Sequence, residues 1–320
     1  MEFVCPACRV EVASGAQSYR CAACSREYPV IAGIPDFRLE PDPYIGIVED
    51  REKGVRLEEF ARDHSFRELL QHYYGITPED PADLAAHWIR RCLAEEEIAR
   101  HVLADWIPDV HGSLLDIGCS TGALLAAASP RGAGLVGVDV AFRWLVIGKT
   151  RLREAGVDAA LVCANAEALP FAEGSFGGVT ATDVLEHTRD ARKAISEARR
   201  VLSPGGSSLW TTNNRWSPLP DPHVHLWGIH YLPVRWQAPY VAWRRRDLHP
   251  YRIRLRSARE WFRLFSEAGF RDARVEGAKI SAPHVRGQLP LRVYNALLGW
   301  PATGALGRMI GPRLRIQAEN

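Results

Sequence analysis

The sequence predicts an α/β fold, in which a largely parallel sheet carries helices on both faces and follows a small cysteine-rich module. Three observations support this prediction. Short apolar strands alternate with helical segments between residues 113 and 214, the first strand turns into a helix through glycines, and two C-x-x-C pairs lie within the first 24 residues. Strands that alternate with helices are typical of parallel sheets covered on both faces.

The glycine turn follows the predicted strand 113–117. Gly118 and Gly122 allow a tight turn and a close backbone approach, and residues 123–128 are strong helix formers. The free N–H groups at the start of such a helix favour a polar or anionic ligand. The next predicted strand, 134–138, is followed by Asp139, a carboxylate placed to accept both hydroxyls of a ribose. These features predict a site for a nucleotide-like ligand.

Three further strands are predicted. Residues 159–163 lead into the segment 165–171, residues 179–182 lead into Asp-Val-Leu-Glu-His at 183–187, and residues 208–212 follow a predicted helix. The glycine turn has the spacing D-x-G-x-x-x-G, which differs from the G-x-G-x-x-G of dinucleotide-binding folds. The series from Gly112 to Asn214 resembles the class I S-adenosylmethionine-dependent methyltransferases, and most closely their type-11 group.

This resemblance implies a Rossmann-like sheet of seven strands whose last strand runs antiparallel at the sheet edge, with S-adenosylmethionine as the cofactor. The residues that it assigns to the cofactor are Asp116, Gly118, Cys119 and Gly122 for the methionine part, Asp139 for the ribose, Asn165 and the Ala166 amide for the adenine, and Asp183 and Val184 as flanking residues. Two departures from the family pattern stand out. Ser120 replaces a glycine, so we expect a relaxed backbone angle there, and Asn165 replaces an aspartate but keeps an acceptor for the adenine amine.

Four cysteines at the N terminus form two C-x-x-C pairs separated by twelve residues: Cys5, Cys8, Cys21 and Cys24. Two such turns complete a tetrahedral thiolate shell for zinc and leave no open position, so we expect a structural metal. Disulfides or redox pairs are the alternatives. No signal peptide is recognised and Cys92, Cys119 and Cys163 are isolated, which favours a reducing, cytoplasmic compartment.

The cysteine module resembles the zinc-ribbon activator of tRNA and release-factor methyltransferases, and its apolar residues Val30, Ile31, Ile34 and Phe37 are expected to dock on a neighbour. We place the zinc ribbon at residues 1–40. A linker and a helical segment that covers the substrate pocket follow at 41–111. The methyltransferase domain spans 112–320 and carries a substrate insertion at 213–257. No apolar run reaches the length of a membrane span.

The predicted insertion gathers aromatic and imidazole side chains among prolines, which is typical of a lid or pocket wall but also of a rigid surface flap. Imidazole suits proton transfer near neutral pH, so the candidates for a catalytic base are His187, His223 and His230, with His225 ranked lower. His223 and His225 form a His-x-His pair, but no nearby acidic or thiol cluster is evident in the sequence to complete a metal site.

The chain is nearly neutral, with a formal net charge of +2, yet residues 235–274 hold eleven arginines against four acidic residues. This stretch is consistent with binding to nucleic acid, to an anionic substrate or to the anionic face of a membrane, and also with a solvated helix surface.

From the resemblance to the methyltransferases, we expect O-methylation of a small-molecule, glycan-linked or lipid-linked acceptor. An rRNA or tRNA base methyltransferase is the main alternative, and a non-catalytic activator that binds the cofactor is the second. Peripheral membrane contact is compatible with all three.

Overall fold

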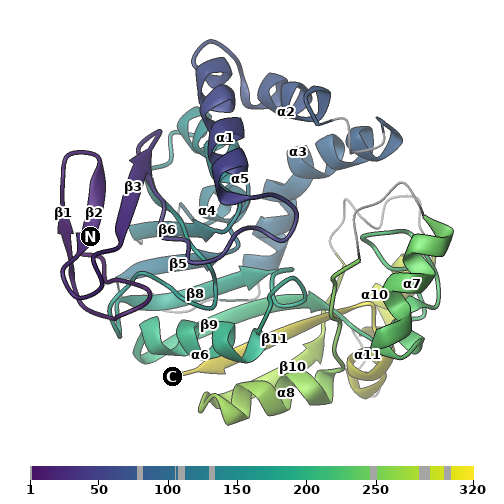
Figure 1. The fold of residues 1–320 in the computed structure, drawn as a ribbon. Coiled ribbons are helices and arrows are strands. Elements are labelled where there is room, and N and C mark those ends of the chain that lie inside the picture. Colours follow the sequence, from purple (N-terminus) through teal and green to yellow (C-terminus); the bar gives the residue numbers. More distant parts are fainter. Residues whose placement is uncertain are drawn as a thin grey trace.

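The computed structural model describes residues 2–77, 82–104, 106, 112–129, 134–245, 251–280, 289–298 and 304–320. Its centre is a seven-stranded sheet with the order β10-β11-β9-β8-β5-β6-β7 (Figure 1). Five strands are parallel: β5 (Ser113–Ile117), β6 (Gly134–Asp139), β7 (Ala159–Cys163), β8 (Phe176–Thr182) and β9 (Leu202–Asn213). The α/β fold and its seven strands are confirmed.

The last strand does not lie at the sheet edge, so that expectation is wrong. β11 (Arg313–Glu319) runs antiparallel between β9 and β10 (Arg271–Gly277), and β10 takes the edge. Only Val275 of β10 is buried, so this strand lacks the apolar pattern that would have revealed it in the sequence.

Helices cover both faces of the sheet and divide the core in two (Figure 1). One face carries α6 (Ala191–Val201) and α8 (Ala258–Glu267), whose apolar sides pack on β9 and β10. Capping residues Asp190 and Ser257 begin these two helices. The other face carries α1 (Ile47–Ala61), α2 (Phe66–Gly75), α3 (Ala82–Ala104), α4 (Ala123–Ala128) and α5 (Phe142–Glu154).

The N-terminal module is a four-stranded antiparallel sheet formed by β1 (Val12–Ser14), β2 (Ser18–Cys21), β3 (Glu27–Ile31) and β4 (Ile34–Pro35). It docks on the edge strand β7 of its own chain. Phe37 N donates to Cys163 O over 2.7 Å, and Val4 N donates to Pro170 O over 3.0 Å. Phe3 and Phe37 belong to the same buried cluster as the central strands, so the ribbon and the large sheet share one core.

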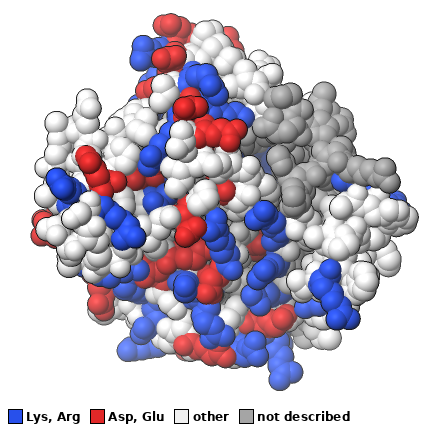
Figure 2. All heavy atoms as spheres, in the orientation of Figure 1, with Lys and Arg blue, Asp and Glu red and all other residues white. Residues whose placement is uncertain are grey.

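The insertion after β9 contains a short 3-10 turn, η2 (Ile229–Tyr231), and α7 (Val234–Arg244), which surround a small core of their own. The tail before β11 contributes α10 (Leu289–Leu298) and α11 (Gly304–Ile310). None of the described helices is both long and apolar enough to cross a membrane. Basic and acidic side chains are intermingled over most of the face drawn in Figure 2.

Candidate cofactor and acceptor site

The glycine loop after β5 is a tight left-handed turn. Gly118, Ser120 and Gly122 have φ angles of 71°, 48° and 72°. The expected relaxation at Ser120 is therefore wrong: the serine adopts a left-handed φ angle, a conformation that a side chain disfavours. A Cβ atom at Gly118 would collide with Val184 Cγ2, so the loop and the end of β8 are in close contact.

Asp139 joins this loop to the next helix. Its Oδ2 accepts the Ser120 N–H over 2.9 Å, and its Oδ1 accepts the Ala141 N–H over 2.8 Å. Burial raises the pKa of the Asp139 carboxyl to about 6. Each carboxylate oxygen keeps a further lone pair, so the residue can also accept the ribose hydroxyls expected from the sequence.

Asp116 and Cys119 line the inner side of the loop. The Asp116 side chain is buried against β8, where Thr180 Oγ1 donates to Asp116 Oδ1 over 2.8 Å. Burial raises the pKa of Asp116 to about 7. Cys119 Sγ fills the space beside Gly137, where a Cβ atom would lie 2.7 Å from the sulfur. Both side chains face the protein core, and the Cys119 backbone is held within the loop, where its N–H donates to Val138 O over 3.0 Å and its C=O accepts the Gly122 N–H over 2.8 Å.

The side-chain amide of Asn165 is hydrogen-bonded to backbone groups of the same chain. Its Oδ1 accepts the N–H groups of Leu39 and Glu40 over 2.9 and 3.1 Å, and its Nδ2 donates to Glu40 O over 3.1 Å. Both lone pairs of the amide oxygen are used, so the contact to the adenine amine expected from the sequence would require release of this segment. The neighbouring Ala166 is partly buried against the large core.

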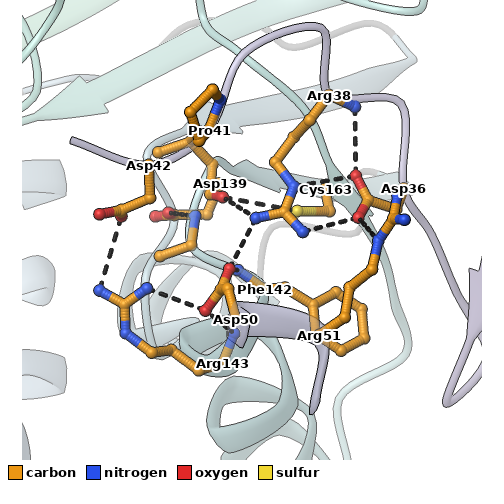
Figure 3. Close-up of polar contacts among 12 residues, drawn as sticks. Asp36, Arg38, Pro41, Asp42, Asp50, Arg51, Asp139, Phe142, Arg143 and Cys163 are labelled. Carbon is orange, nitrogen blue, oxygen red and sulfur yellow. Dashed lines mark hydrogen bonds and ion pairs between the residues drawn. The ribbon is translucent and has the colours of Figure 1, made fainter. Parts of the chain in front are cut away.

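The segment that holds Asn165 is the strap, defined as residues 36–42. Arg38 is its buried centre and donates to both carboxylate oxygens of Asp36, to Asp50 Oδ2 over 2.6 Å and to Val140 O over 3.1 Å (Figure 3). Asp50 in turn accepts the Phe142 N–H at the start of α5 over 2.8 Å. The strap thus forms a wall beside Asp139, in a region that the sequence indicated only as the end of the ribbon and a linker.

A second polar cluster lies where β8 and β9 end. Asp183 has a φ of 55°, and its Oδ2 accepts from Arg313 Nη2 over 2.9 Å. Arg91 of α3 lies 3.5 Å from the same oxygen, so α3 reaches this cluster. Asp183 Oδ1 is buried and has no hydrogen-bond partner among the described residues. A buried acceptor without a partner is costly, which favours a polar ligand group at this position.

Asp221 of the insertion organises the candidate bases and was missed in the sequence. It accepts the His223 N–H over 2.7 Å and the Tyr251 hydroxyl over 2.9 Å. His223 Nδ1 lies 3.4 Å and His230 Nε2 lies 2.8 Å from its carboxylate, at ion-pair distance without the alignment of a hydrogen bond. The signal that could have found Asp221 is its position two residues before His223, where an aspartate caps a turn.

The imidazoles separate into two groups. The His187 and His223 rings lie 5.0 Å apart, whereas the exposed His225 ring lies 5.6 Å from His87 of α3. Burial, with His223 nearby, lowers the pKa of His187 to about 4. Burial would also lower the pKa of His223, but Asp221 outweighs it and raises that pKa above its ordinary value.

Glu186 completes the cluster. Its buried carboxyl accepts from Thr212 Oγ1 over 2.9 Å and from Asn213 Nδ2 over 3.1 Å, and burial raises its pKa. Ligand atoms of Glu186, His187 and His223 lie within 4.8 Å of one another, a spacing compatible with a metal ion. Folding thus brings Glu186, four residues after the end of β8, to His223 of the insertion, and His225 is not part of this group.

The four N-terminal cysteines converge on one point. Their sulfur atoms lie within 4.8 Å of one another, and Cys5 Sγ and Cys24 Sγ are 3.7 Å apart. Zinc–sulfur bonds of about 2.3 Å in a tetrahedron place sulfur atoms about 3.8 Å apart, so the four thiols fit a zinc ion. No described cysteine forms a disulfide.

Part of the chain is similar to known methyltransferases. Residues 115–209 match the family model described as a methyltransferase domain. Ubiquinone biosynthesis O-methyltransferase of Pseudomonas aeruginosa is 32% identical over 133 residues, covering 39% of this chain and 54% of that protein. The enzyme of the same description from Pseudomonas entomophila is 36% identical over 117 residues, covering 36% and 48%. The chain spans about half the length of the curated relatives it matches.

Two solved structures are also similar. The S-adenosylmethionine-dependent methyltransferase of Mesorhizobium loti is 19% identical, covers 71% of this chain and 98% of its own, and has a TM-score of 0.48. The complex of the Trm112 methyltransferase activator with a methyltransferase of Haloferax volcanii is 16% identical, covers 82% and 96%, and has a TM-score of 0.46.

The family match and the curated relatives define the class: the chain contains an S-adenosylmethionine-dependent methyltransferase domain. The resemblance that the motifs carried is thereby confirmed. Within this class, the domain bears an N-terminal ribbon with a four-cysteine cluster and an insertion after β9.

Proposed function

We propose that the whole chain is an S-adenosylmethionine-dependent O-methyltransferase that acts on a hydroxyl of a small-molecule, glycan-linked or lipid-linked acceptor. The observation that carries this proposal is the Asp221–His223 pair beside His187 at the end of β8. A carboxylate that holds an imidazole is an arrangement suited to accepting a proton from a hydroxyl. The curated relatives are named O-methyltransferases, which supports a hydroxyl acceptor.

S-adenosylmethionine, when bound, supplies a methyl carbon made electrophilic by its sulfonium. Asp139 would hold the ribose, and the loop 118–122 would hold the methionine part. Asp183 Oδ1, buried without a partner among the described residues, would accept a polar group of the cofactor or the acceptor. These contacts align the reacting atoms, which is the main requirement of a direct displacement.

His223 would take the hydroxyl proton as the acceptor oxygen bonds the methyl carbon and the carbon–sulfur bond breaks. Because Nδ1 faces Asp221, Nε2 is left to accept that proton. Asp221 is then a positioning residue that stabilises the charged imidazolium. His187 stays neutral at neutral pH because of its lowered pKa, and it would contribute to the pocket wall.

The ribbon would hold one structural zinc ion through Cys5, Cys8, Cys21 and Cys24. The sulfur spacing and the all-thiol donor set support this assignment. Four thiolates leave no open position, so we assign the metal a role in folding the ribbon onto β7 and none in methyl transfer.

The test incubates the protein with methyl-labelled cofactor and separate small-molecule, lipid and RNA fractions of a cell extract. We expect label in an ether-linked product of the small-molecule or lipid fraction. Label only in RNA, with strong inhibition by salt, would favour the base methyltransferase. Cofactor binding without label in any fraction would favour the non-catalytic activator.

A further inference from the structure

We propose that α7 and the helices α10 and α11 form a surface that binds membranes rich in anionic lipid. This surface is separate from the cofactor site, and its binding to lipid is measurable without methyl transfer. We name it the lipid-facing surface and define it by six exposed residues: Trp236, Trp243, Arg244, Leu289, Arg308 and Met309.

The helix α7 exposes the apolar side chains that a surface helix normally buries. Only Gln237 and Val241 of its eleven residues are buried. Trp236 is 56% exposed and Trp243 is 66% exposed. Exposed tryptophan side chains close to arginines are typical of segments that lie in a membrane interface.

The two tail helices repeat this pattern. On α10, Leu289 is 68% exposed, and on α11, Met309 is 63% exposed. Asn214 Nδ2, at the start of the insertion, donates to Met309 O over 3.1 Å, which ties the tail to the insertion. Figure 1 shows α7, α10 and α11 at the same end of the molecule, and Figure 2 shows the α7 region as white and blue atoms.

The charged residues of these segments are all basic. Residues 222–246 and 289–310, which include these helices, contain six arginines and no lysine, aspartate or glutamate, in a chain that has 38 acidic residues elsewhere. Among the described residues, Arg235 and Arg244 flank the tryptophans of α7, and Arg308 adjoins Met309 on α11. Arginine next to exposed apolar side chains is complementary to anionic headgroups above acyl chains.

A membrane explains this composition better than other partners. Leucine, valine, isoleucine and methionine offer no flat ring on which RNA bases could stack, yet they make up most of the exposed apolar residues of α10 and α11. A second copy of this chain would bring two basic surfaces together. The insertion core of Val224, Ile229 and Val241 joins α7 to the segment that carries Asp221 and His223, so membrane binding would bring the acceptor cluster close to lipid-soluble acceptors.

The test measures cosedimentation of the full-length protein with vesicles of phosphatidylcholine, with and without 30% phosphatidylglycerol. We expect at least tenfold stronger partitioning onto the anionic vesicles. The double variant Trp236→Ser, Trp243→Ser should lose at least tenfold of that partitioning. The control is Phe262→Ser on α8, a comparably exposed apolar side chain (49%) away from the surface, which should bind as wild type.

Thermal unfolding verifies that the variants are folded, and quenching of tryptophan fluorescence by brominated lipid supplies a readout on the unmodified protein. No partitioning of wild-type protein, no quenching, or an equal loss in Phe262→Ser would overturn the proposal. Partitioning that is abolished by the addition of structured RNA would also overturn it, because the surface would then be an RNA site.

Discussion

Arg38 donates from Nη1 to Asp50 Oδ2 over 2.6 Å, and this contact joins the end of the ribbon to the helix that begins beside Asp139 (Figure 3). Both side chains are completely buried. The charges of Arg38 and Arg51 also hold the pKa of Asp36 below its ordinary value, although burial alone would raise it. The strap is therefore part of the protein core.

Replacement of Arg38 by methionine should lower the free energy of unfolding by about 3 to 5 kcal/mol, because Asp36 and Asp50 would lose the buried arginine that they share and would keep only Arg51 and Arg143 as partners. Urea unfolding measures this loss. The matched control is Arg51→Met, which removes a partner of Asp36 whose side chain is 29% exposed and should cost clearly less. Equal losses in the two variants would contradict the central role of Arg38.

Zinc binding and the stability of the large domain should be linked. One zinc per chain is expected by elemental analysis, and Cys5→Ser should lose it and lower the melting temperature of the whole protein in a single transition. The reason is the shared core of Phe3, Phe37 and the central strands. Cys92→Ser, at a buried cysteine outside the cluster, should keep its zinc. An unchanged main transition in Cys5→Ser would show that the ribbon is separable.

Asp116 should make the unliganded protein less stable as the pH rises. Its folded pKa of about 7 lies above the ordinary aspartate pKa of 3.8, so its contribution to stability is fully present below pH 3.8 and is lost as the pH rises through 7. Between pH 5 and 7 the wild type should lose up to about 1.4 kcal/mol per pH unit relative to Asp116→Asn. Parallel stability curves for the two proteins would refute the raised pKa.

The pH dependence of turnover distinguishes the two imidazoles. If His223 is the base, the acidic limb of the rate profile lies above pH 6.5, because Asp221 raises its pKa, whereas His187 would place that limb near pH 4. His223→Ala should lower turnover by about 100-fold at unchanged cofactor affinity. Asp221→Asn should move the acidic limb to lower pH. An acidic limb near pH 4 in the wild-type profile would instead indicate that His187 is the catalytic base.

The parallel strands could be predicted because they are apolar and bounded by turns, but four features could not be predicted from local sequence patterns. The β10 strand buries only Val275, so its pattern was too weak to detect. Arg38 reaches Val140, more than 100 residues away, so its burial is set by tertiary packing. Asp221 is a polar residue in a loop, and its role in the cluster becomes visible only from its contacts with His230 and Tyr251 in the folded chain. Ser120 kept a strained angle because Asp139 holds its N–H group.

The central claim is that the glycine loop and Asp139 bind S-adenosylmethionine. Titration calorimetry of this cofactor into wild-type protein and Asp139→Ala tests it most directly. We expect one site per chain and a loss of about 1.5 to 3 kcal/mol of binding free energy in the variant, since a charged acceptor of the ribose is removed. Unchanged affinity in a folded Asp139→Ala protein, or no binding by the wild type, would contradict the assignment of the site.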